Sequence, residues 1–128
     1  MVTASNGRGK LQAMNTYPEN RCASYHAHVY FDANTLERAR VLCRCAGDLF
    51  AVVVGKIHEK RVGPHPRWSC QIAFDAGQFD RLIAWLDENR NGLSILVHGL
   101  TGNDLADHSE HVSWLGEPVA LNLSFFES

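Results

Sequence analysis

The chain has 128 residues, of which 45% are hydrophobic and 20% are charged, and its formal net charge is -2. This length and composition are typical of one globular domain, and the near-neutral charge argues against nucleic-acid or membrane-surface partners. No apolar run is long enough to span a bilayer, and residues 1–24 lack the apolar core of a secretory signal. The sequence therefore predicts a cytoplasmic protein.

Residues 1–23 show no hydrophobic periodicity and contain several Ser, Asn and Gly residues. They predict a flexible N-terminal arm, followed by a single domain over residues 24–128. The four cysteines have neither zinc-finger nor disulfide-framework spacing. We therefore expect them to be reduced residues of the core or surface.

The stretch of residues 25–31 (YHAHVYF) predicts a strand, because aromatic and β-branched residues dominate it and it alternates with a period of two. Successive side chains of a strand point to opposite faces. The apolar side chains therefore share one face, while His26, His28 and Tyr30 share the other. Two imidazoles on a face away from the core are either solvent-facing groups of an open sheet or part of a chemical site.

The rest of the chain predicts two amphipathic helices and further strands. Apolar residues at helical spacing mark the helices, and short runs rich in β-branched or aromatic residues mark the strands. The expected elements are a helix over 36–46, strands over 49–57 and 68–74, a helix over 76–90, a strand over 93–98 and a last edge strand over 119–125.

Two further histidines fall between these elements. Residues 63–66 (GPHP) must form a loop, because the two prolines fix φ and restrict the residues before them, so His65 is held at a defined place. Residues 104–114 are polar and predict at most a short helix, which contains His108. His108 either closes a turn through a hydrogen bond or contributes to a site.

The order β-α-β-β-α-β with an extra strand is the ferredoxin-like plan, an α+β sandwich in which two helices cover one face of an antiparallel sheet. The first strand lies at the centre of that sheet. The strand pattern then brings His26, His28 and His98 to the face away from the helices. Apolar residues such as Leu96 would be exposed on that face, so the sequence also predicts a homodimer.

A cluster of three histidines, or of two histidines and a carboxylate, suits zinc or non-haem Fe(II). The candidate carboxylates are Glu59, Asp107 and Glu110, all in predicted loops or turns. In such a site His65 and His108 would be free for proton transfer, because imidazole changes its protonation near neutral pH.

The chain also resembles a known family, the DOPA 4,5-dioxygenase family of small aromatic ring-opening dioxygenases. The resemblance covers about residues 24–125 in order. It rests on residues 25–31 (YHAHVYF), 63–66 (GPHP), 89–98 (NRNGLSILVH), 100–102 (LTG), 107–108 (DH) and 114–117 (WLGE). One departure is Gly99, where family members usually have proline, and it implies a looser turn after His98.

The resemblance implies extradiol cleavage of a small catecholic substrate such as DOPA, with O2 as co-substrate. The expected cofactor is Fe(II), with zinc or another divalent metal as the alternative. In this assignment His26, His28 and His98 bind the metal, while His65 and His108 act as an acid–base pair. An equally allowed arrangement makes His65 a ligand and leaves His26 beside the ligands.

Tyr30, Trp68 and Gln71 are the expected pocket residues. Two other functions are compatible with the same histidines. One is a non-catalytic ferredoxin-like dimeric module that binds a ligand or metal and keeps its fold without stoichiometric metal. The other is a zinc hydrolase or isomerase, which would work without oxygen.

Overall fold

The computed structural model describes residues 17–109 and 111–126, and within them it has the predicted α+β organisation. The elements follow the expected order, with a short helix and a fifth strand added after the fourth strand. They are β1 (Ser24–Phe31), α2 (Leu36–Leu49), β2 (Val53–His58), β3 (Trp68–Asp75), α3 (Ala76–Asn89), β4 (Ile95–Gly99), α4 (Asp104–Asp107), β5 (Val112–Leu115) and a 3-10 helix over Leu123–Phe126.

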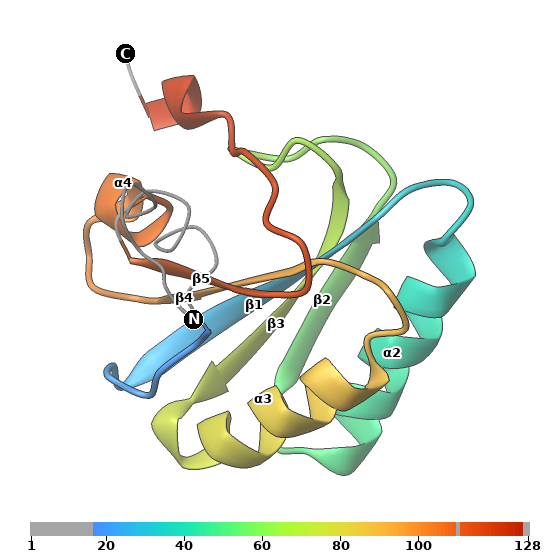
Figure 1. The fold of residues 1–128 in the computed structure, drawn as a ribbon. Helices are drawn as coiled ribbons and strands as arrows, with labels where there is room; N and C mark the ends of the chain where they lie inside the picture. Colours follow the sequence, from blue (N-terminus) through green and yellow to red (C-terminus); the bar gives the residue numbers. More distant parts are fainter. Residues whose placement is uncertain (1–16, 110, 127–128) are drawn as a thin grey trace, which may run out of the picture.

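The five strands form one antiparallel sheet in the order β2-β3-β1-β4-β5, with β1 in its centre as predicted (Figure 1). The register places His26 between Ala73 of β3 and His98 of β4. Because directly paired residues of an antiparallel sheet point to the same face, two histidines from distant parts of the chain become neighbours.

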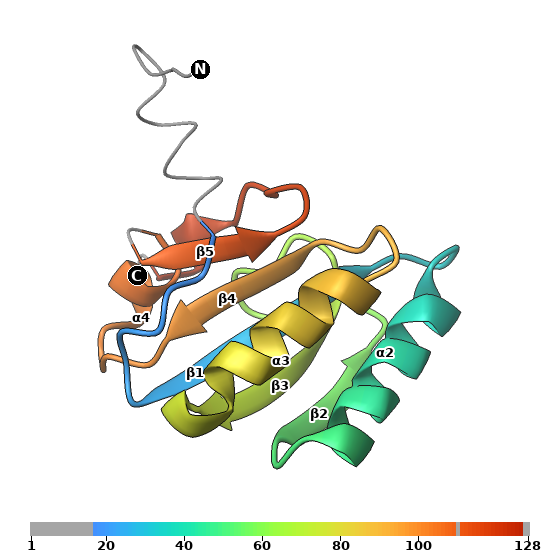
Figure 2. The ribbon, with the colours of Figure 1, turned by 60° about the horizontal axis from the view of Figure 1, so that its bottom comes forward.

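The main hydrophobic core lies between the sheet and the helices α2 and α3, which cover the same sheet face (Figure 2). Each helix buries one apolar stripe, as the periodicity predicts. The helix α3 is capped by Asp75, the residue before it, whose carboxylate accepts hydrogen bonds from the backbone N–H groups of Gly77 and Gln78. This cap satisfies two donors that the first turn of a helix leaves unpaired.

The opposite sheet face is also covered, which corrects the expectation that Leu96 is exposed. Leu96 is 0% exposed and packs with Tyr30 and Trp114 in a second cluster, called here the outer cluster. Val119 and Leu121, from the chain after β5, pack against this cluster. Exposure of Leu96 therefore gives no support to a dimer.

The predicted edge strand over 119–125 is wrong. The extra strand is Val112–Leu115, which pairs with β4 through Ile95 opposite Leu115 and His98 opposite Val112. Residues 119–125 alternate in polarity as a strand would, but among the described residues no strand pairs with them, and Leu123–Phe126 forms a 3-10 helix instead.

Gly99, from which a looser turn after His98 is expected, is the last residue of β4. Gly99 is buried, pairs with Tyr25 inside the sheet and is packed against Cys22. A Cβ atom at Gly99 would overlap the sulfur atom of Cys22. The space that a larger side chain at position 99 would need is therefore occupied by Cys22.

Of the predicted N-terminal arm, residues 1–16 lie outside the described residues. Residues 20–22 contact the domain, because the Tyr25 hydroxyl donates to Asn20 Oδ1 and accepts from the backbone N–H groups of Arg21 and Cys22. The four cysteines are free, as expected.

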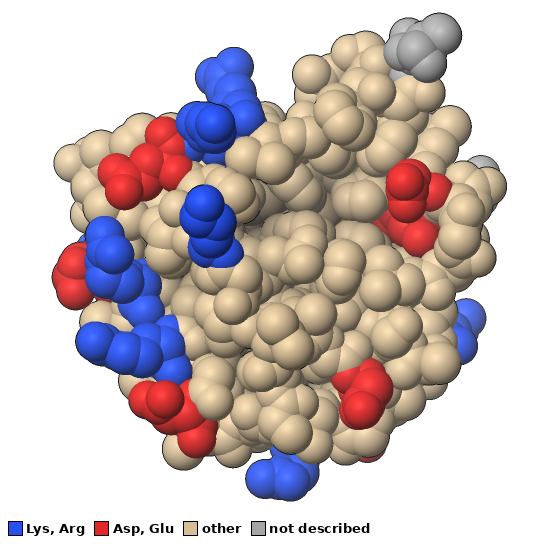
Figure 3. Space-filling model, turned by 180° about the vertical axis from the view of Figure 1, so that it is seen from behind, with Lys and Arg blue, Asp and Glu red and all other residues tan. Residues whose placement is uncertain are grey.

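None of the helices in the described part of the chain is both long and apolar enough to cross a membrane. The face seen from behind in Figure 3 carries charged side chains of both signs around its rim, and its middle is uncharged. Charges of mixed sign agree with the small net charge of the whole chain.

Candidate metal centre

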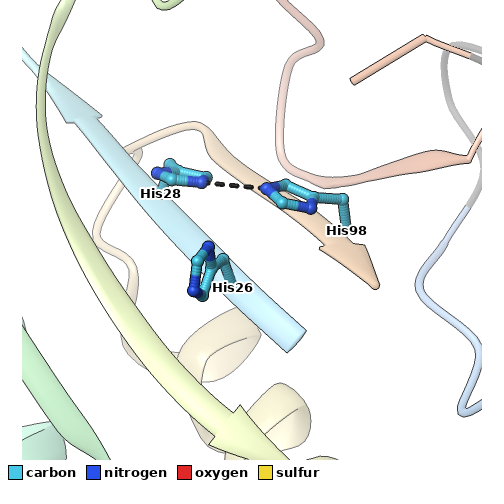
Figure 4. Close-up of side chains that lie close together, drawn as sticks. All are labelled: His26, His28 and His98. Atoms are coloured by element: carbon cyan, nitrogen blue, oxygen red, sulfur yellow. Dashed lines mark hydrogen bonds between the residues drawn. The ribbon is translucent and has the colours of Figure 1, made fainter. Parts of the chain in front are cut away.

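Three histidines on adjacent strands form the first candidate metal group. They lie on the sheet face opposite the helices, called here the outer sheet face. His26 and His28 come from β1 and His98 comes from β4 (Figure 4), and one ring nitrogen of each lies within 4.8 Å of the others. The Nε2 atoms of His28 and His98 are 3.1 Å apart. Two imidazole nitrogens bound to one ion at about 2.1 Å lie about 3 to 3.4 Å apart, so this spacing fits a shared ion.

A second candidate group consists of His28, His65 and His108, whose ring nitrogens also lie within 4.8 Å of one another. His65 comes from the loop between β2 and β3, where Asn122 N donates to the Pro64 carbonyl at 2.8 Å. His108 follows α4 directly. The two groups share His28, so all five predicted site histidines converge around one place.

Hydrogen bonds at Nδ1 determine how two of these rings are protonated. Nδ1 of His98 lies 3.0 Å from the Gly99 carbonyl, and Nδ1 of His108 lies 2.8 Å from the Asp104 carbonyl. A carbonyl oxygen only accepts, so each Nδ1 carries the proton and donates it. A ring that carries its single proton on Nδ1 has a bare Nε2, which is the form that binds a metal or accepts a proton.

Burial favours the uncharged form of three of these rings. His28 is 5% exposed and His98 is 2% exposed. Desolvation is the main cause that lowers the pKa of His65 and of His98 to about 4, and that lowers the pKa of His28 well below its usual value. The neighbouring imidazoles add to the lowering of each. At neutral pH these rings are neutral, so a metal ion would compete with few protons.

The candidate carboxylates do not join the histidines in either group. Asp107 is 1% exposed, but its oxygens accept from the backbone N–H of Thr101 at 3.1 Å and from the Thr101 hydroxyl at 2.6 Å. This carboxylate therefore ties the turn after β4 to α4. Glu59 is exposed, and Glu110 lies outside the described residues. Among the described residues, both groups contain histidine alone.

The three predicted pocket residues have different positions. Tyr30 is 2% exposed, and its hydroxyl lies 2.7 Å from Nδ1 of His65. Gln71 is half-buried and pairs with His28 in the sheet. Trp68 packs against Phe31 on the helix side of the sheet, so its assignment to the pocket is wrong.

The hydrogen bond between Tyr30 and His65 is the feature of the site that the sequence analysis missed. Alternation along β1 indicates the face on which Tyr30 lies, but no spacing relates it to a loop 35 residues away. The site as a whole combines nitrogen ligands for a divalent metal with imidazoles that can move protons.

Comparison with known proteins gives consistent matches. The sequence profile of the Dopa 4,5-dioxygenase family matches residues 25–125. A DOPA 4,5-dioxygenase from Amanita muscaria is 32% identical over 120 residues, which are 87% of this chain and 53% of that protein. An uncharacterized 21.2 kDa protein from Botryotinia fuckeliana is 28% identical over 113 residues, or 79% of this chain and 62% of that protein. The chain thus spans little more than half of these relatives.

A solved structure shares the fold. The crystal structure of a provisionally identified dioxygenase from Nostoc punctiforme, at 1.46 Å resolution, superimposes with a TM-score of 0.80 and is 44% identical in sequence. The match covers 82% of this chain and 91% of the other.

Proposed function

The chain belongs to the Dopa 4,5-dioxygenase family, and from this premise we propose that it opens the ring of a catechol such as DOPA by extradiol cleavage with O2. The observation that carries the proposal is the convergence of five histidines, three of them buried, around one place on the outer sheet face. The Amanita muscaria relative, described as a DOPA 4,5-dioxygenase, supports a catechol as the substrate class.

The proposed metal ligands are His26, His28 and His98, and the proposed metal is Fe(II). Their rings fit a divalent ion because they are nitrogen donors of low pKa from two rigid, paired strands. The chemistry that Fe(II) supplies when bound is electron transfer between a catechol and dioxygen.

The other work belongs to groups of the chain itself. His65 and His108 lie beside His28, so we assign them the proton transfers of the reaction, between a catechol hydroxyl, the opening ring and water. Tyr30, Leu96 and Trp114 form an apolar floor next to the histidines. Such a floor excludes bulk water and strengthens the hydrogen bonds that orient a bound catechol.

The test is anaerobic loading of the purified protein with Fe(II), addition of a panel of catechols and then admission of air. We expect a yellow ring-opened product that requires both iron and air. His28→Ala should abolish it, while His58→Ala, at the end of β2 and outside both histidine groups, should not. Product formed without air would favour a zinc hydrolase or isomerase. Absence of both product and bound metal would leave a non-catalytic binding module.

We also propose a cytoplasmic homodimer. The support for a dimer comes from apolar residues on the surface, such as Val53 on the edge strand β2, which is 70% exposed, and Phe125. An unpaired strand edge next to apolar side chains favours self-association. Light scattering after size-exclusion chromatography should give twice the mass of one chain, and the mass of a single chain would contradict the proposal.

A further inference from the structure

A buried hydrogen bond links Tyr30 of β1 to His65 of the loop between β2 and β3. We propose that Tyr30 is a positioning residue that holds His65 with its proton on Nε2, so that His65 is the hydrogen-bond donor of the site and His108 the acceptor. The assignment of these roles rests on the proposed function, but the placement of the proton on His65 can be tested without it.

Tyr30 is held firmly by its surroundings. Its backbone N–H donates to the Ser94 carbonyl at 2.9 Å, and its ring packs edge-on against Trp114, with the ring centres 5.9 Å apart. Leu96 completes the apolar surroundings of the ring. Because both its backbone and its ring are fixed, the Tyr30 hydroxyl has a defined position, 2.7 Å from Nδ1 of His65.

The direction of this hydrogen bond follows from the partners of the hydroxyl. Among the described residues the Tyr30 hydroxyl has a single hydrogen-bond partner, Nδ1 of His65. If Nδ1 were the donor, the phenolic proton would be buried without an acceptor, which costs about 1–3 kcal/mol. Tyr30 therefore donates to a bare Nδ1, and the neutral His65 ring must carry its own proton on Nε2.

The neighbouring rings have the opposite protonation. Nδ1 of His98 and Nδ1 of His108 face carbonyl oxygens, which can only accept, so these two rings keep their protons on Nδ1 and have a bare Nε2. The difference arises from the partner of Nδ1, a hydroxyl for His65 and a carbonyl for the other two. A cluster of chemically identical side chains thereby acquires different functions.

These protonation states give a balanced proton sequence. The bare Nε2 of His108 takes the proton that a catechol hydroxyl loses and later returns it to an oxygen of the opening ring. Nε2–H of His65 donates a hydrogen bond to that oxygen and keeps its own proton. The proton that leaves one catechol oxygen is thus returned to another oxygen of the substrate, and both rings end in the protonation state in which they began.

The experiment is nitrogen NMR of the histidine rings in the metal-free full chain at pH 8, where unperturbed imidazoles are neutral. A protonated and a bare ring nitrogen differ widely in their 15N shift. We expect His65 to be protonated on Nε2, with His98 and His108 protonated on Nδ1 as internal references. In Tyr30→Phe, His65 should shift towards protonation on Nδ1. Tyr25→Phe, which removes a buried hydroxyl on the other face of β1, should leave His65 unchanged.

Two NMR results would overturn the inference: His65 protonated on Nδ1 in the unmodified protein, or an unchanged His65 in folded Tyr30→Phe. The first measurement needs no variant, so a misfolded Tyr30→Phe would not prevent the test.

In the iron-loaded enzyme, Tyr30→Phe should lower kcat about 10-fold or more with iron content unchanged. A parallel loss of iron would identify His65 as a ligand and would also contradict us. If no catechol is turned over by any form, the proposed function fails while the NMR result stands.

Discussion

His28 lies at the centre of the candidate site because it belongs to both histidine groups that could hold a metal. Its place on β1 and its partner His98 could be expected from strand alternation and sheet order, since a side chain on a paired strand has only two directions to point. The positions of His65 and His108 could not be worked out in the same way. Loops fix their side chains through tertiary contacts, such as the hydrogen bond between Asn122 N and the Pro64 carbonyl.

Single-histidine variants should separate the two possible ligand sets. We expect His28→Ala to remove metal binding in any case, because both sets use it. His26→Ala should weaken Fe(II) binding by more than about 100-fold, a larger loss than that of a residue beside the ligands. His65→Ala should keep the metal and lose turnover. Metal titration by calorimetry or competition measures this, and the reverse behaviour of His26→Ala and His65→Ala would contradict our assignment.

The close packing of Gly99 and Cys22 gives a prediction for stability. Gly99→Ala should destabilise the protein by about 1–3 kcal/mol, because the new methyl group overlaps the Cys22 sulfur atom. Cys22→Ala removes that sulfur atom, so the double variant should regain most of the loss. Urea unfolding of both single variants and the double variant measures the coupling. Strictly additive effects would show that the two residues do not compete for space.

Among the larger elements, the loop that carries His65 shows how a segment without helix or strand can be well defined. Pro64 and Pro66 flank His65 and restrict the backbone on both sides of it. The backbone N–H of His65 donates to the Val62 carbonyl, and the C-terminal segment is attached at Pro64 through Asn122. The backbone of the loop is therefore restricted, and the imidazole of His65 is held in a defined position.

Pro66→Gly should release this restriction. We expect a stability loss of about 0.4–1 kcal/mol, since glycine gives the unfolded chain more freedom, together with a fall in kcat as His65 becomes mobile. Pro118→Gly, which changes a half-buried proline outside this loop, is the matched control. It should lose similar stability and keep its kcat. Thermal unfolding and steady-state kinetics measure both, and equal kcat losses would show that the loop has no special role.

At the level of elements, the two main helices and the first four strands could be predicted from their runs of apolar residues. The bounds of the second strand were wrong, because α2 continues to Leu49 and β2 begins only at Val53. The fifth strand could not be predicted, since Val112–Leu115 is only four residues long and is defined by its pairing with β4. Residues 119–125 have a better strand pattern, but their apolar residues Val119 and Leu121 pack on the outer cluster instead. The availability of β4 as a pairing partner therefore determines which of the two stretches, 112–115 or 119–125, forms a strand.

The molecule as a whole buries two different layers on the two faces of one sheet. The helices bury an apolar core, while the outer face buries the outer cluster together with the imidazoles of His28, His65 and His98. Burial of neutral imidazoles favours metal binding and at the same time makes the metal-free fold sensitive to acid. The same groups thus affect both function and stability.

The metal-free protein should lose stability as the pH falls from about 6.5 towards 4. The folded-state pKa values of His65 and His98 are lowered to about 4, so within this window the unfolded chain binds more protons than the folded one. We expect the free energy of unfolding to fall by at least about 1 kcal/mol between pH 7 and pH 5. Urea unfolding at the two pH values measures it, and His98→Gln should show a weaker dependence. An equal stability at both pH values would contradict the lowered pKa values.

The most direct test of our account is the stoichiometry of oxygen uptake by the iron-loaded protein with a catechol. An oxygen electrode and the absorbance of the ring-opened product, recorded together, should show one O2 consumed for each ring opened and no hydrogen peroxide. Uptake that yields hydrogen peroxide or a quinone, or ring opening that consumes no oxygen, would contradict the dioxygenase function that we propose.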